Sequence, residues 1–460
     1  MYLYRILFLS LILTSFILTS CENDDDNLNA HSEMNTCIGC HTNYQALKDV
    51  YTPVPDSLKE TFGCSGKFEF IEPYDRVYIQ NIEEFINKDP HGKIPCTDCH
   101  NGIDNTVDKH LAHTGTPNKP FIKHPSTKAI EKCEPCHHNI VQQVESSIHK
   151  NGWGLKTKVT IRYGLAGANE YNQLPNNIKE GYENNCSNCH GSCGQCHVNR
   201  PIASGGGLIN NHMFIKTPDI QKNCLSCHKC GSGYDYFGNA SGANADIHYT
   251  KLGFNCLTCH SGSELHGDGN IYETRFHVAD LPQCSDCHKD IQNKNLWHTM
   301  HINNLSCYVC HSQPYNNCGS CHIGIEGARI QPYQGFKIGD NPLKNTIETK
   351  QGNDYDFNKK WSLVRRTLIA PDSWEKYGIT NLANFDAFPV YNYTAPHNIQ
   401  RRTPQTSGIT CFSGCHISKN DTGFINKELY LFDADFKFPW ERSSSSKVAV
   451  DGKLPKRWGL

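Results

Sequence analysis

The chain has 460 residues and a formal net charge of −2, and only 37% of its residues are hydrophobic. Its length permits two or three domains, but an ordinary apolar core would be thin for this length. The chain also has 25 cysteines and 25 histidines, so a large apolar cofactor held by these residues is expected to fill the interior. The net charge by itself is uninformative about nucleic acid, but no nucleic-acid partner is expected, because such a partner needs a clustered basic face and the predicted cofactor would add acidic groups.

The first twenty residues have the pattern of an export signal. Arg5 precedes an apolar stretch from Ile6 to Leu18, and Thr19, Ser20 and Cys21 follow. This ending resembles a bacterial lipobox, which implies cleavage before Cys21 and a lipid on its sulfur. A plain secretory signal with an incidental cysteine is the alternative, and both readings export the chain. No later apolar run reaches about 18 residues, so no membrane span is expected in the mature protein.

A five-residue pattern, Cys-x-x-Cys-His, occurs ten times after this segment, and we number its copies motif 1 to motif 10 in chain order. An eleventh copy, motif 11, has one extra residue between its cysteines. Chance would give only about 0.1 copies of the regular pattern at this composition. The eleven motifs are formed by Cys37, Cys40 and His41; Cys96, Cys99 and His100; Cys133, Cys136 and His137; Cys186, Cys189 and His190; Cys193, Cys196 and His197; Cys224, Cys227 and His228; Cys256, Cys259 and His260; Cys284, Cys287 and His288; Cys307, Cys310 and His311; Cys318, Cys321 and His322; and Cys411, Cys415 and His416.

The spacing within each motif suits the covalent attachment of haem. Two thiols bind the two vinyl groups of one porphyrin as thioethers, and the imidazole that follows reaches the iron. Zinc sites and disulfides are the alternative uses of such cysteines, but neither requires a histidine after every second cysteine. The motifs therefore predict about eleven haem c groups. Two further cysteines, Cys64 and Cys230, are left as one disulfide or as two unpaired thiols.

Fourteen histidines lie outside the motifs, enough to give every iron a second imidazole. The favoured candidates are His91, His110, His113, His124, His138, His149, His212, His248, His277, His298, His301 and His397. His31 and His266 are less favoured. Only Met34, Met213 and Met300 follow Met1, so low-potential haems with two histidines are expected. The spacing leaves open which haem each histidine serves.

The expected fold class is mainly coil with short α-helices and little β structure, a multihaem cytochrome c fold organised around a packed haem array. One helix is expected near Ile79 to Ile86, ending before Pro90, and another from motif 3 to His149. The expected division is 1–20, a lipoprotein signal peptide; 21–36, an acidic tether; 37–180, motifs 1–3; 181–323, motifs 4–10; 324–410, a haem-poor subdomain; and 411–460, motif 11 with a loose tail. A long surface connection is the alternative for 324–410.

These motifs resemble those of bacterial multihaem cytochromes c over residues 37–416. Motif 3, followed by a helix that reaches Ser147, Ile148 and His149, is similar to a segment shared by octahaem tetrathionate reductases, hydroxylamine oxidoreductases and related proteins. The density of motifs, together with the lipobox, is more similar to surface decahaem and undecahaem electron conduits of metal-respiring bacteria. The Cys-x-x-Cys-Lys motif of pentahaem nitrite reductases does not occur in this sequence, which disfavours that activity.

The function expected from these features is electron transfer through closely packed haems in anaerobic or extracellular respiration, with no catalytic residue assigned. The expected partners are redox proteins or an extracellular acceptor, the membrane through the lipid on Cys21, and no nucleic acid; an outer-membrane or respiratory complex is a further option. The expected location is the periplasmic or cell-surface face of the outer membrane. The alternatives are a structural subunit of a respiratory complex, or a haem oxidoreductase with one open iron site that reduces a small sulfur or nitrogen oxyanion. For the oxidoreductase, the candidates to bind the anion are Arg365, Arg366, Arg401 and Arg402, whose ordinary roles are propionate pairing or solvated surface.

Overall fold

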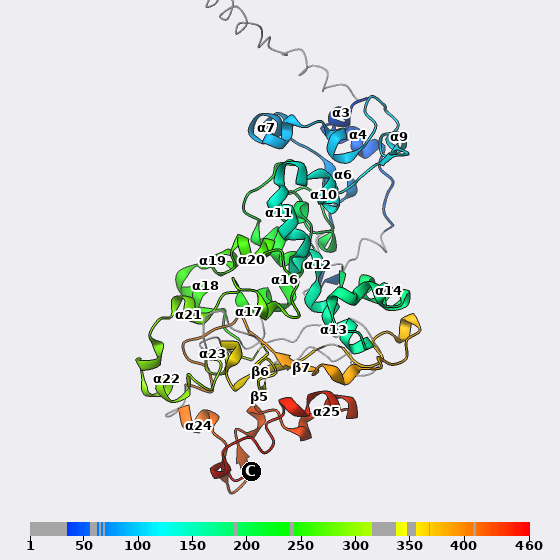
Figure 1. The fold of residues 1–460 in the computed structure, drawn as a ribbon. Helices are drawn as coiled ribbons and strands as arrows, with labels where there is room; N and C mark the ends of the chain where they lie inside the picture. Colours follow the sequence, from blue (N-terminus) through cyan, green and yellow to red (C-terminus); the bar gives the residue numbers. More distant parts are fainter. Residues whose placement is uncertain are drawn as a thin grey trace, which may run out of the picture. The chain divides into compact units, whose positions relative to one another are not determined.

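The computed structural model describes residues 35–55, 62–63, 66–67, 70–187, 191–239, 243–314, 337–346, 356–367, 369–407 and 411–460. Backbone contacts divide the chain into two compact units. Unit 1 contains the described residues up to 53 and 73–123, and unit 2 contains those of 54–72 and 124–460. Both units consist mainly of short helices joined by coil, with little strand, as the sequence predicts (Figure 1). The division by motif content stays a prediction.

Unit 1 is built from single helical turns. In chain order it contains α3 (Cys37–His41), α4 (Tyr44–Asp49), α6 (Pro73–Val77), α7 (Ile82–Lys88), the 3-10 turn Pro90–Lys93, α8 (Cys96–His100), α9 (Lys109–Ala112), and the hairpin of β3 (Gly115–Thr116) and β4 (Lys119–Pro120). The helix expected before Pro90 is confirmed as α7. Asn81 accepts a hydrogen bond from the Glu84 amide and begins it, because an asparagine at this position satisfies a free amide of the first turn.

The first part of unit 2 is mainly helical, and its described residues include motifs 3 and 5–9 in helices or short turns. The helices are α10 (Ala129–Lys132), α11 (Glu134–Ser146), α12 (Ile148–Asn151), α13 (Trp153–Tyr163), α14 (Asn176–Asn185), α15 (Cys193–His197), α16 (Leu225–His228), α17 (Tyr234–Tyr236), α18 (Ile247–Leu252), α19 (Cys256–Cys259), α20 (Gly262–His266), α21 (Cys284–Cys287), α22 (Leu296–His301) and α23 (Cys307–His311), with short 3-10 or π turns at 125–128, 168–173, 202–204, 220–224, 229–233, 275–277 and 291–293.

The helix expected between motif 3 and His149 is present but broken. Ser147 has extended backbone angles, and its hydroxyl accepts from the Lys150 amide to begin α12. A serine side chain that caps a new helix competes with the continuation of the old one. Gly152 ends α12 in the left-handed conformation at φ 68°, where glycine carries no steric penalty. His149 is therefore held on its own short helix.

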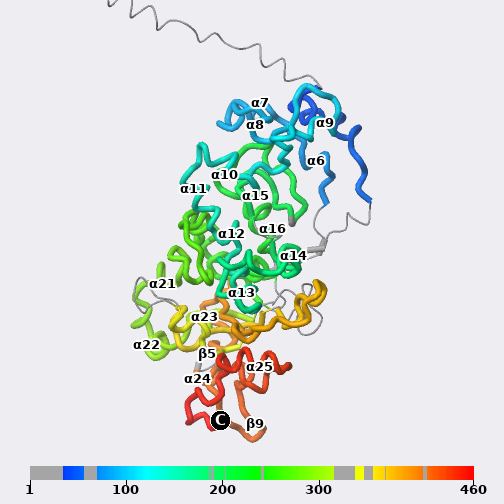
Figure 2. The backbone as a smooth tube through the Cα atoms, turned by 45° about the vertical axis from the view of Figure 1, so that its right-hand side comes forward, coloured from blue at the N-terminus to red at the C-terminus, as the bar shows by residue number. Residues whose placement is uncertain are grey.

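The rest of unit 2 contains the largest sheet. Its antiparallel strands run in the order β5 (Lys337–Asp340), β6 (Trp361–Arg366) and β7 (Tyr391–Tyr393), and Ile338 lies opposite Leu363. Beyond it come α24 (Cys411–Cys415), the hairpin of β8 (Ser418–Asn420) and β9 (Gly423–Ile425), α25 (Pro439–Ser445), and 3-10 turns at 356–358, 375–377, 385–387, 427–429, 433–435, 446–448 and 456–458. A small hairpin joins β1 (Phe62–Gly63) to β2 (Gly66–Lys67). Figures 1 and 2 both show β5 between α16 on one side and α24 and α25 on the other.

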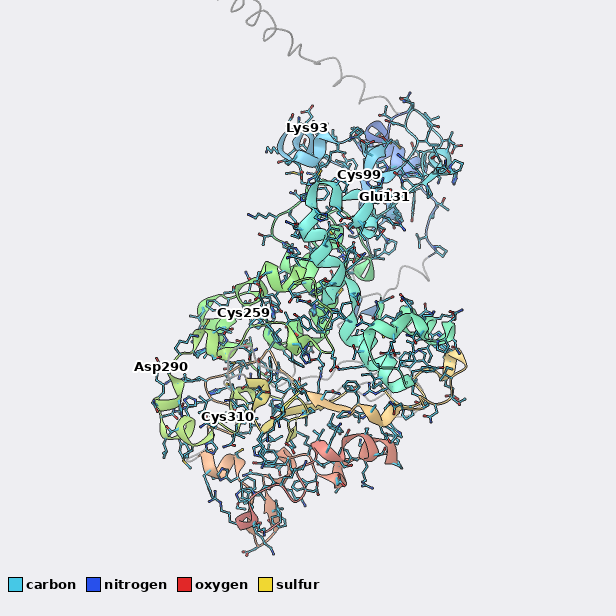
Figure 3. The ribbon with its side chains drawn as sticks, in the orientation of Figure 1. Lys93, Cys99, Glu131, Cys259, Asp290 and Cys310 are labelled. Carbon is cyan, nitrogen blue, oxygen red and sulfur yellow. The ribbon has the colours of Figure 1, made fainter. Side chains whose placement is uncertain are left out.

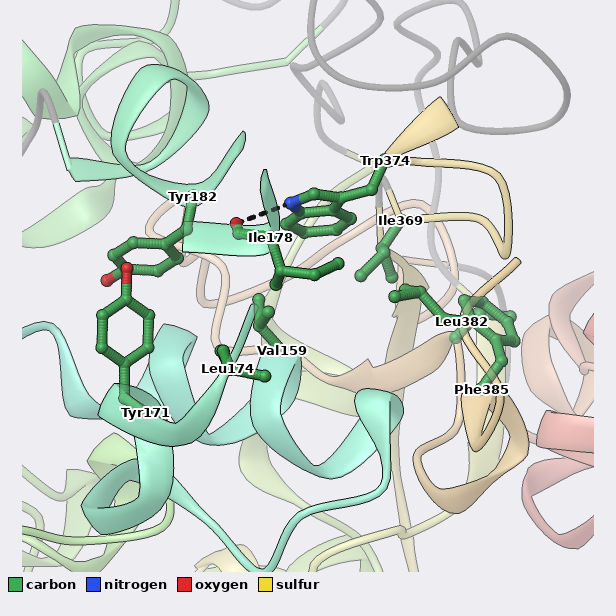
Figure 4. Close-up of a cluster of buried hydrophobic side chains, with 10 residues drawn as sticks. Val159, Tyr171, Leu174, Ile178, Tyr182, Ile369, Trp374, Leu382 and Phe385 are labelled. Carbon is green, nitrogen blue, oxygen red and sulfur yellow. Dashed lines mark hydrogen bonds between the residues drawn. The ribbon is translucent and has the colours of Figure 1, made fainter. Parts of the chain in front are cut away.

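The largest apolar cluster joins α13 and α14 to the segment after β6. Trp374 is 1% exposed and donates its Nε1–H to the Ile178 carbonyl at 2.9 Å (Figure 4). A Cβ on Gly181 would lie 2.3 Å from the Trp374 Nε1 atom, so only glycine allows the indole to approach this closely. Val159 and Leu382 complete the contact between the two segments.

The end of the chain is packed, and the expectation of a loose tail is wrong. Val448 and Val450 are fully buried in two clusters with β5 and β6. Ser445, in the serine run, is buried and accepts from the Val390 amide at 3.0 Å. The serines misled the prediction because their hydroxyls bond to backbone groups here, which lets polar residues be buried at low cost.

Several predicted residues lie outside the described part of the chain. They are the signal and tether with Cys21 and His31; Met34; Cys64; Cys189 and His190 of motif 4; Cys318, Cys321 and His322 of motif 10; and the side chains of Cys230 and Cys411. Within the described residues, the structure has no helix both long and apolar enough to cross a bilayer.

Candidate metal centres

Most of the motifs fold as a single helical turn that ends at or just before the histidine. This is the conformation of α3, α8, α15, α16, α19, α21, α23 and α24. Residues three apart share one face of a helix, so both thiols of a motif lie on the same side and the imidazole follows them. Figure 3 labels Cys259 of motif 7 and Cys310 of motif 9. Motif 3 differs, because Cys133 lies between α10 and α11 and His137 interrupts the helical angles at φ −117°, ψ 41°.

Some of these turns are fixed by caps from distant residues. Asp356 accepts from the Ser306 hydroxyl and the Cys307 amide at 2.5 and 2.6 Å, and from the Tyr393 hydroxyl at 2.8 Å. In unit 1, Asp104 accepts from the Cys37 amide at 2.8 Å. A carboxylate at a helix start satisfies free amides and interacts favourably with the helix dipole. The acidic residues therefore hold the attachment turns in place.

Seven histidines of the motifs each face one histidine from outside the motifs. The pairs, with the distance between ring centres, are His41 and His113, 6.1 Å; His197 and His266, 6.1 Å; His228 and His149, 6.3 Å; His260 and His397, 6.3 Å; His288 and His248, 6.0 Å; His311 and His298, 6.1 Å; and His416 and His301, 6.0 Å. Every one of these pairs combines a motif histidine with a histidine from elsewhere in the sequence.

The distance between the rings has a direct chemical meaning. Two imidazoles that bind one metal from opposite sides, each at about 2 Å from nitrogen to metal, hold their ring centres about 6 Å apart. All seven pairs lie within 6.0–6.3 Å. Rings that merely stack or meet edge to face have centres anywhere from about 4.5 to 7 Å apart. The seven distances agree with the spacing expected for two imidazoles on one metal, although contacts such as His248 with Phe254, at 6.2 Å, have similar ring-centre distances.

Hydrogen bonds fix which ring nitrogen is available. The Nδ1 atom of the motif histidine lies 3.1 Å from the Val77 carbonyl at His41 and 2.7 Å from the Ile215 carbonyl at His197. The facing histidine of motif 1, His113, has its Nδ1 2.7 Å from a carbonyl one turn back in its own helix. A carbonyl can only accept, so Nδ1 carries the proton and Nε2 is left free to bind a metal.

Two of the pairs use a carboxylate instead of a carbonyl. His260 Nδ1 lies 2.9 and 3.1 Å from the two oxygens of Glu264. His248 Nδ1 lies 2.8 Å from Asp246, whose side chain is 3% exposed. Such carboxylate–histidine contacts orient a metal ligand and raise its basicity.

Burial lowers the pKa of some of the paired imidazoles, among them His228 and His397. Burial, with the neighbouring cation of Arg275 and other histidines, lowers the pKa of His397 to about 3 and that of His228 to about 4. Burial raises the pKa of the Cys224 thiol to about 11. Neutral imidazole is the form that binds a metal, and a protonated thiol is a poor metal ligand. The imidazoles of His228 and His397 are therefore in the form that binds a metal, whereas the Cys224 thiol is not.

The surroundings of the pairs also fit a large apolar group. Leu296 is 63% exposed and Met300 57% on α22, which carries two of the paired histidines. Leu252 is 60% exposed on α18 beside His248, and Phe412 is 53% exposed in motif 11. Apolar side chains gathered around ligand-bearing turns gain stability when a porphyrin covers them. The residues present therefore fit haem.

One helix connects three of the pairs. In α20, Glu264 bonds to His260 of motif 7, and the Leu265 carbonyl accepts from His149, the partner of motif 6. The next residue, His266, pairs with motif 5. Three consecutive residues thus contact the ligands of motifs 5, 6 and 7.

A second connection is made by residues 397–400. His397 pairs with motif 7, and the Ile399 amide donates to Asp246 at 2.8 Å, which holds the partner of motif 8. The Gln400 carbonyl accepts from His311 of motif 9 at 3.0 Å. On α22, His298 pairs with motif 9 and His301 with motif 11. In unit 2 the described pairs therefore follow one another in the order of motifs 5, 6, 7, 8, 9 and 11.

The other candidate histidines have different surroundings. His91 Nδ1 lies 2.8 Å from Asp89, and His138 pairs with Glu134 on an exposed face. His277 stacks on Tyr272, with Nδ1 close to Thr274. His110 is exposed on α9, His124 precedes the 3-10 turn at 125–128, and His212 has φ 70°. In motif 2, His100 Nδ1 lies 2.9 Å from the Ile122 carbonyl.

Sequence reasoning undervalued His266 and missed the two carboxylates. His266 follows motif 7 by six residues and precedes no motif closely, so nothing local pointed to its pairing with motif 5. The carboxylates had a local signal: Asp246 and His248, like Asp89 and His91, form an Asp-x-His pattern in which one carboxylate accepts from both the amide and Nδ1 of the histidine.

The arginines considered for anion binding are separated by the fold. Arg366 is 2% exposed and forms an ion pair with Glu441, which is also 2% exposed. Arg365 is half-buried on β6, and Arg401 and Arg402 are exposed. Arg366 is therefore a structural residue.

Among the described residues, no group of three or more histidine, cysteine or acidic side chains forms a metal site. A haem iron takes only two ligands from the protein. Comparisons found no protein family, no curated protein and no solved structure that matches this chain.

Proposed function

We propose that this protein is a multihaem c-type cytochrome that binds about eleven haem groups and carries electrons between redox partners. The seven pairs of imidazoles, each with ring centres 6.0–6.3 Å apart, carry this proposal. The pairing of one motif histidine with one distant histidine is the arrangement of a haem c with two histidine ligands. The same pairs support the multihaem fold that the sequence predicts.

The proposal assigns axial ligands to seven motifs. The motif histidine and its partner are His41 with His113, His197 with His266, His228 with His149, His260 with His397, His288 with His248, His311 with His298, and His416 with His301. When bound, each haem supplies a one-electron redox centre. The protein's part is to fix the two imidazoles through their Nδ1 bonds and to cover the ring with apolar side chains.

Electron transfer is favoured over catalysis at these seven sites. Two imidazoles occupy both axial positions of an iron, which leaves no position for a substrate. The connections through α20, residues 397–400 and α22 hold neighbouring sites close together. We propose an exported lipoprotein attached to the membrane through Cys21, with soluble redox proteins or an extracellular acceptor as partners.

One observation favours a second function, reduction of a small oxyanion. Burial and the charges of Arg162, Arg275 and Arg365 lower the pKa of Lys158 to about 7. Four basic side chains in one neighbourhood call for an anion, which is either a haem propionate or a bound substrate. The charge of Arg275 also acts on His228 and His397, and the sites of these two histidines have two imidazoles each. Because an iron with two imidazoles has no free position for a substrate, the basic side chains are better explained as partners of a haem propionate.

The test is to produce the protein with and without a c-type maturation system and to measure its intact mass and its electron paramagnetic resonance spectrum. We expect a mass increase of eleven haem groups for the eleven motifs, and low-spin ferric signals from the seven assigned sites. A colourless matured protein would contradict the proposal. A high-spin fraction that binds nitrite, sulfite or tetrathionate would favour the oxyanion reductase.

A further inference from the structure

The paired histidines fall into two classes by the group that accepts their Nδ1 proton. At motifs 1, 5, 6, 9 and 11 the described contacts are to neutral groups: backbone carbonyls, such as Gln400 for His311 and Trp297 for His301, and the Asn295 side-chain amide for His298. At motif 8 the acceptor is Asp246, and at motif 7 it is Glu264. The two carboxylates thus act on motifs 7 and 8, which are neighbours in the row of motifs 5, 6, 7, 8, 9 and 11.

Asp246 is held rigidly. It is 2% exposed, and its Oδ1 atom accepts from both the amide and Nδ1 of His248 at 2.8 Å. Its Oδ2 atom accepts from the Ile399 amide at 2.8 Å. Three donors hold the carboxylate against the imidazole, so its negative charge stays one ring away from the metal position at motif 8.

Glu264 makes the same kind of contact, but with a motif histidine, His260, whereas Asp246 contacts a histidine from outside the motifs. Both oxygens lie within 3.1 Å of His260 Nδ1, and the Glu264 side chain is 12% exposed. The Ser261 hydroxyl accepts from the Glu264 amide at 3.1 Å and begins α20. Glu264 lies in the first turn of α20, and His260 lies just before that helix, so the start of α20 positions the carboxylate against the imidazole.

We propose that Asp246 and Glu264 are positioning residues that give motifs 8 and 7 the lowest midpoint potentials among the seven paired sites. A carboxylate bonded to Nδ1–H makes the imidazole a stronger donor to iron and places a negative charge near it. Both effects stabilise the oxidised metal, which carries one more positive charge than the reduced metal. This inference rests on the proposed function and adds a low-potential step to the middle of the row.

Nearby cations set the order of the two sites. Arg275 acts on His397, the second imidazole of motif 7, and a cation there opposes the effect of Glu264. At motif 8 the buried Asp246 is the charge in direct contact with the ligand. Charges in contact act more strongly than distant ones. Motif 8 is therefore expected to have the lower potential of the two.

The experiment compares matured wild-type protein with D246N and E264Q by redox titration followed with electron paramagnetic resonance, which resolves individual low-spin haems. Each substitution keeps a carbonyl oxygen that can accept from Nδ1 but removes the charge. We expect the midpoint potential of one haem to rise in each variant, with a larger shift for D246N, and the number of haems per chain to stay unchanged.

The matched control is D290N. Asp290 follows His288 of motif 8 by two residues (Figure 3), is exposed, and has φ 53°, a conformation that asparagine also adopts readily. This substitution removes the same charge near the same motif without touching an imidazole. We expect no haem to shift beyond a small change that salt screens.

The outcomes separate this inference from the proposed function. A wild-type protein without haem would refute the function. A fully loaded D246N or E264Q protein whose potentials match those of wild type, or a shift as large in D290N, would refute the role of the carboxylates alone. If E264Q or D246N loses haem, the variants that keep the charge decide. Fully loaded E264D and D246E proteins must keep the midpoint potentials of motifs 7 and 8 below those of the other five paired sites for the inference to stand.

Discussion

Two stretches of unit 2 of similar length are built in different ways. In residues 191–314, which carry motifs 5–9, the buried apolar side chains among the described residues are only Val198, Leu225 and Val309. In residues 337–460, which carry one motif, the described residues include 19 buried apolar side chains. The later stretch has a sheet and clusters of its own, whereas the earlier one has turns that present histidines and exposed apolar groups.

This difference shows what replaces a core in the first stretch. A chain of this length needs buried apolar area to offset the entropy of ordering its backbone. Residues 191–314 do not provide it from their own side chains, so a porphyrin between paired imidazoles is the natural substitute. The later stretch provides its own core and, through His397 and Asp356, anchors the ligands and turns of the first.

The largest expected effect comes from leaving haem out. In chain made without maturation, we expect residues 191–314 to lose protection from amide hydrogen exchange, while β5 and β6 keep part of theirs, because residues 337–460 supply most of the buried side chains of the apolar clusters. Hydrogen exchange read by mass spectrometry on both forms is the measurement. Equal protection of both stretches in the haem-free chain would remove the basis of the comparison.

The next effect probes the apolar cluster itself. W374A removes an indole that is 1% exposed and the hydrogen bond to Ile178, and we expect a loss of about 4 kcal/mol of unfolding free energy. Denaturant unfolding of the matured protein, followed by far-UV circular dichroism, measures it. Haem content should not change, because Trp374 belongs to no motif. A loss below about 1 kcal/mol would mean that this cluster is not a stabilising core.

A buried ion pair offers a third test in the same stretch. E441Q leaves the Arg366 guanidinium buried without its carboxylate, and we expect a loss of about 3 kcal/mol. The matched control is E84Q, which breaks the exposed pair of Glu84 and Lys88 in unit 1 and should cost about 0.5 kcal/mol or less. Thermal unfolding of both variants gives the comparison. Similar losses in the two variants would argue against burial as the cause.

The smallest expected effect is confined to a single site in the motif-rich stretch. H266A removes the imidazole that faces His197, so we expect one haem to become high-spin while the others keep their signals. H266M is the companion variant, because a thioether restores a low-spin iron at a higher potential. Electron paramagnetic resonance counts both forms. An unchanged spectrum in H266A would remove this ligand assignment for motif 5.

The features of this protein differ in how well its sequence predicts them. The attachment turns were predictable because two thiols and one imidazole act within five or six residues. The short helices and the end of α7 before Pro90 were predictable from local chemistry. The packed end of the chain was not, because the serines that suggested a tail are satisfied by distant backbone groups such as Val390.

The sequence by itself determined which side chains are the candidate ligands, since the motif is a local constraint on chemistry and spacing. Only the tertiary structure decided which imidazoles face each other. The partners of His260 and His197 come from segments far along the chain, and no local periodicity encodes such contacts. The proposed role of Asp246 and Glu264 likewise depends on the tertiary structure, because the effect of a charge on a metal site depends on its distance from that site.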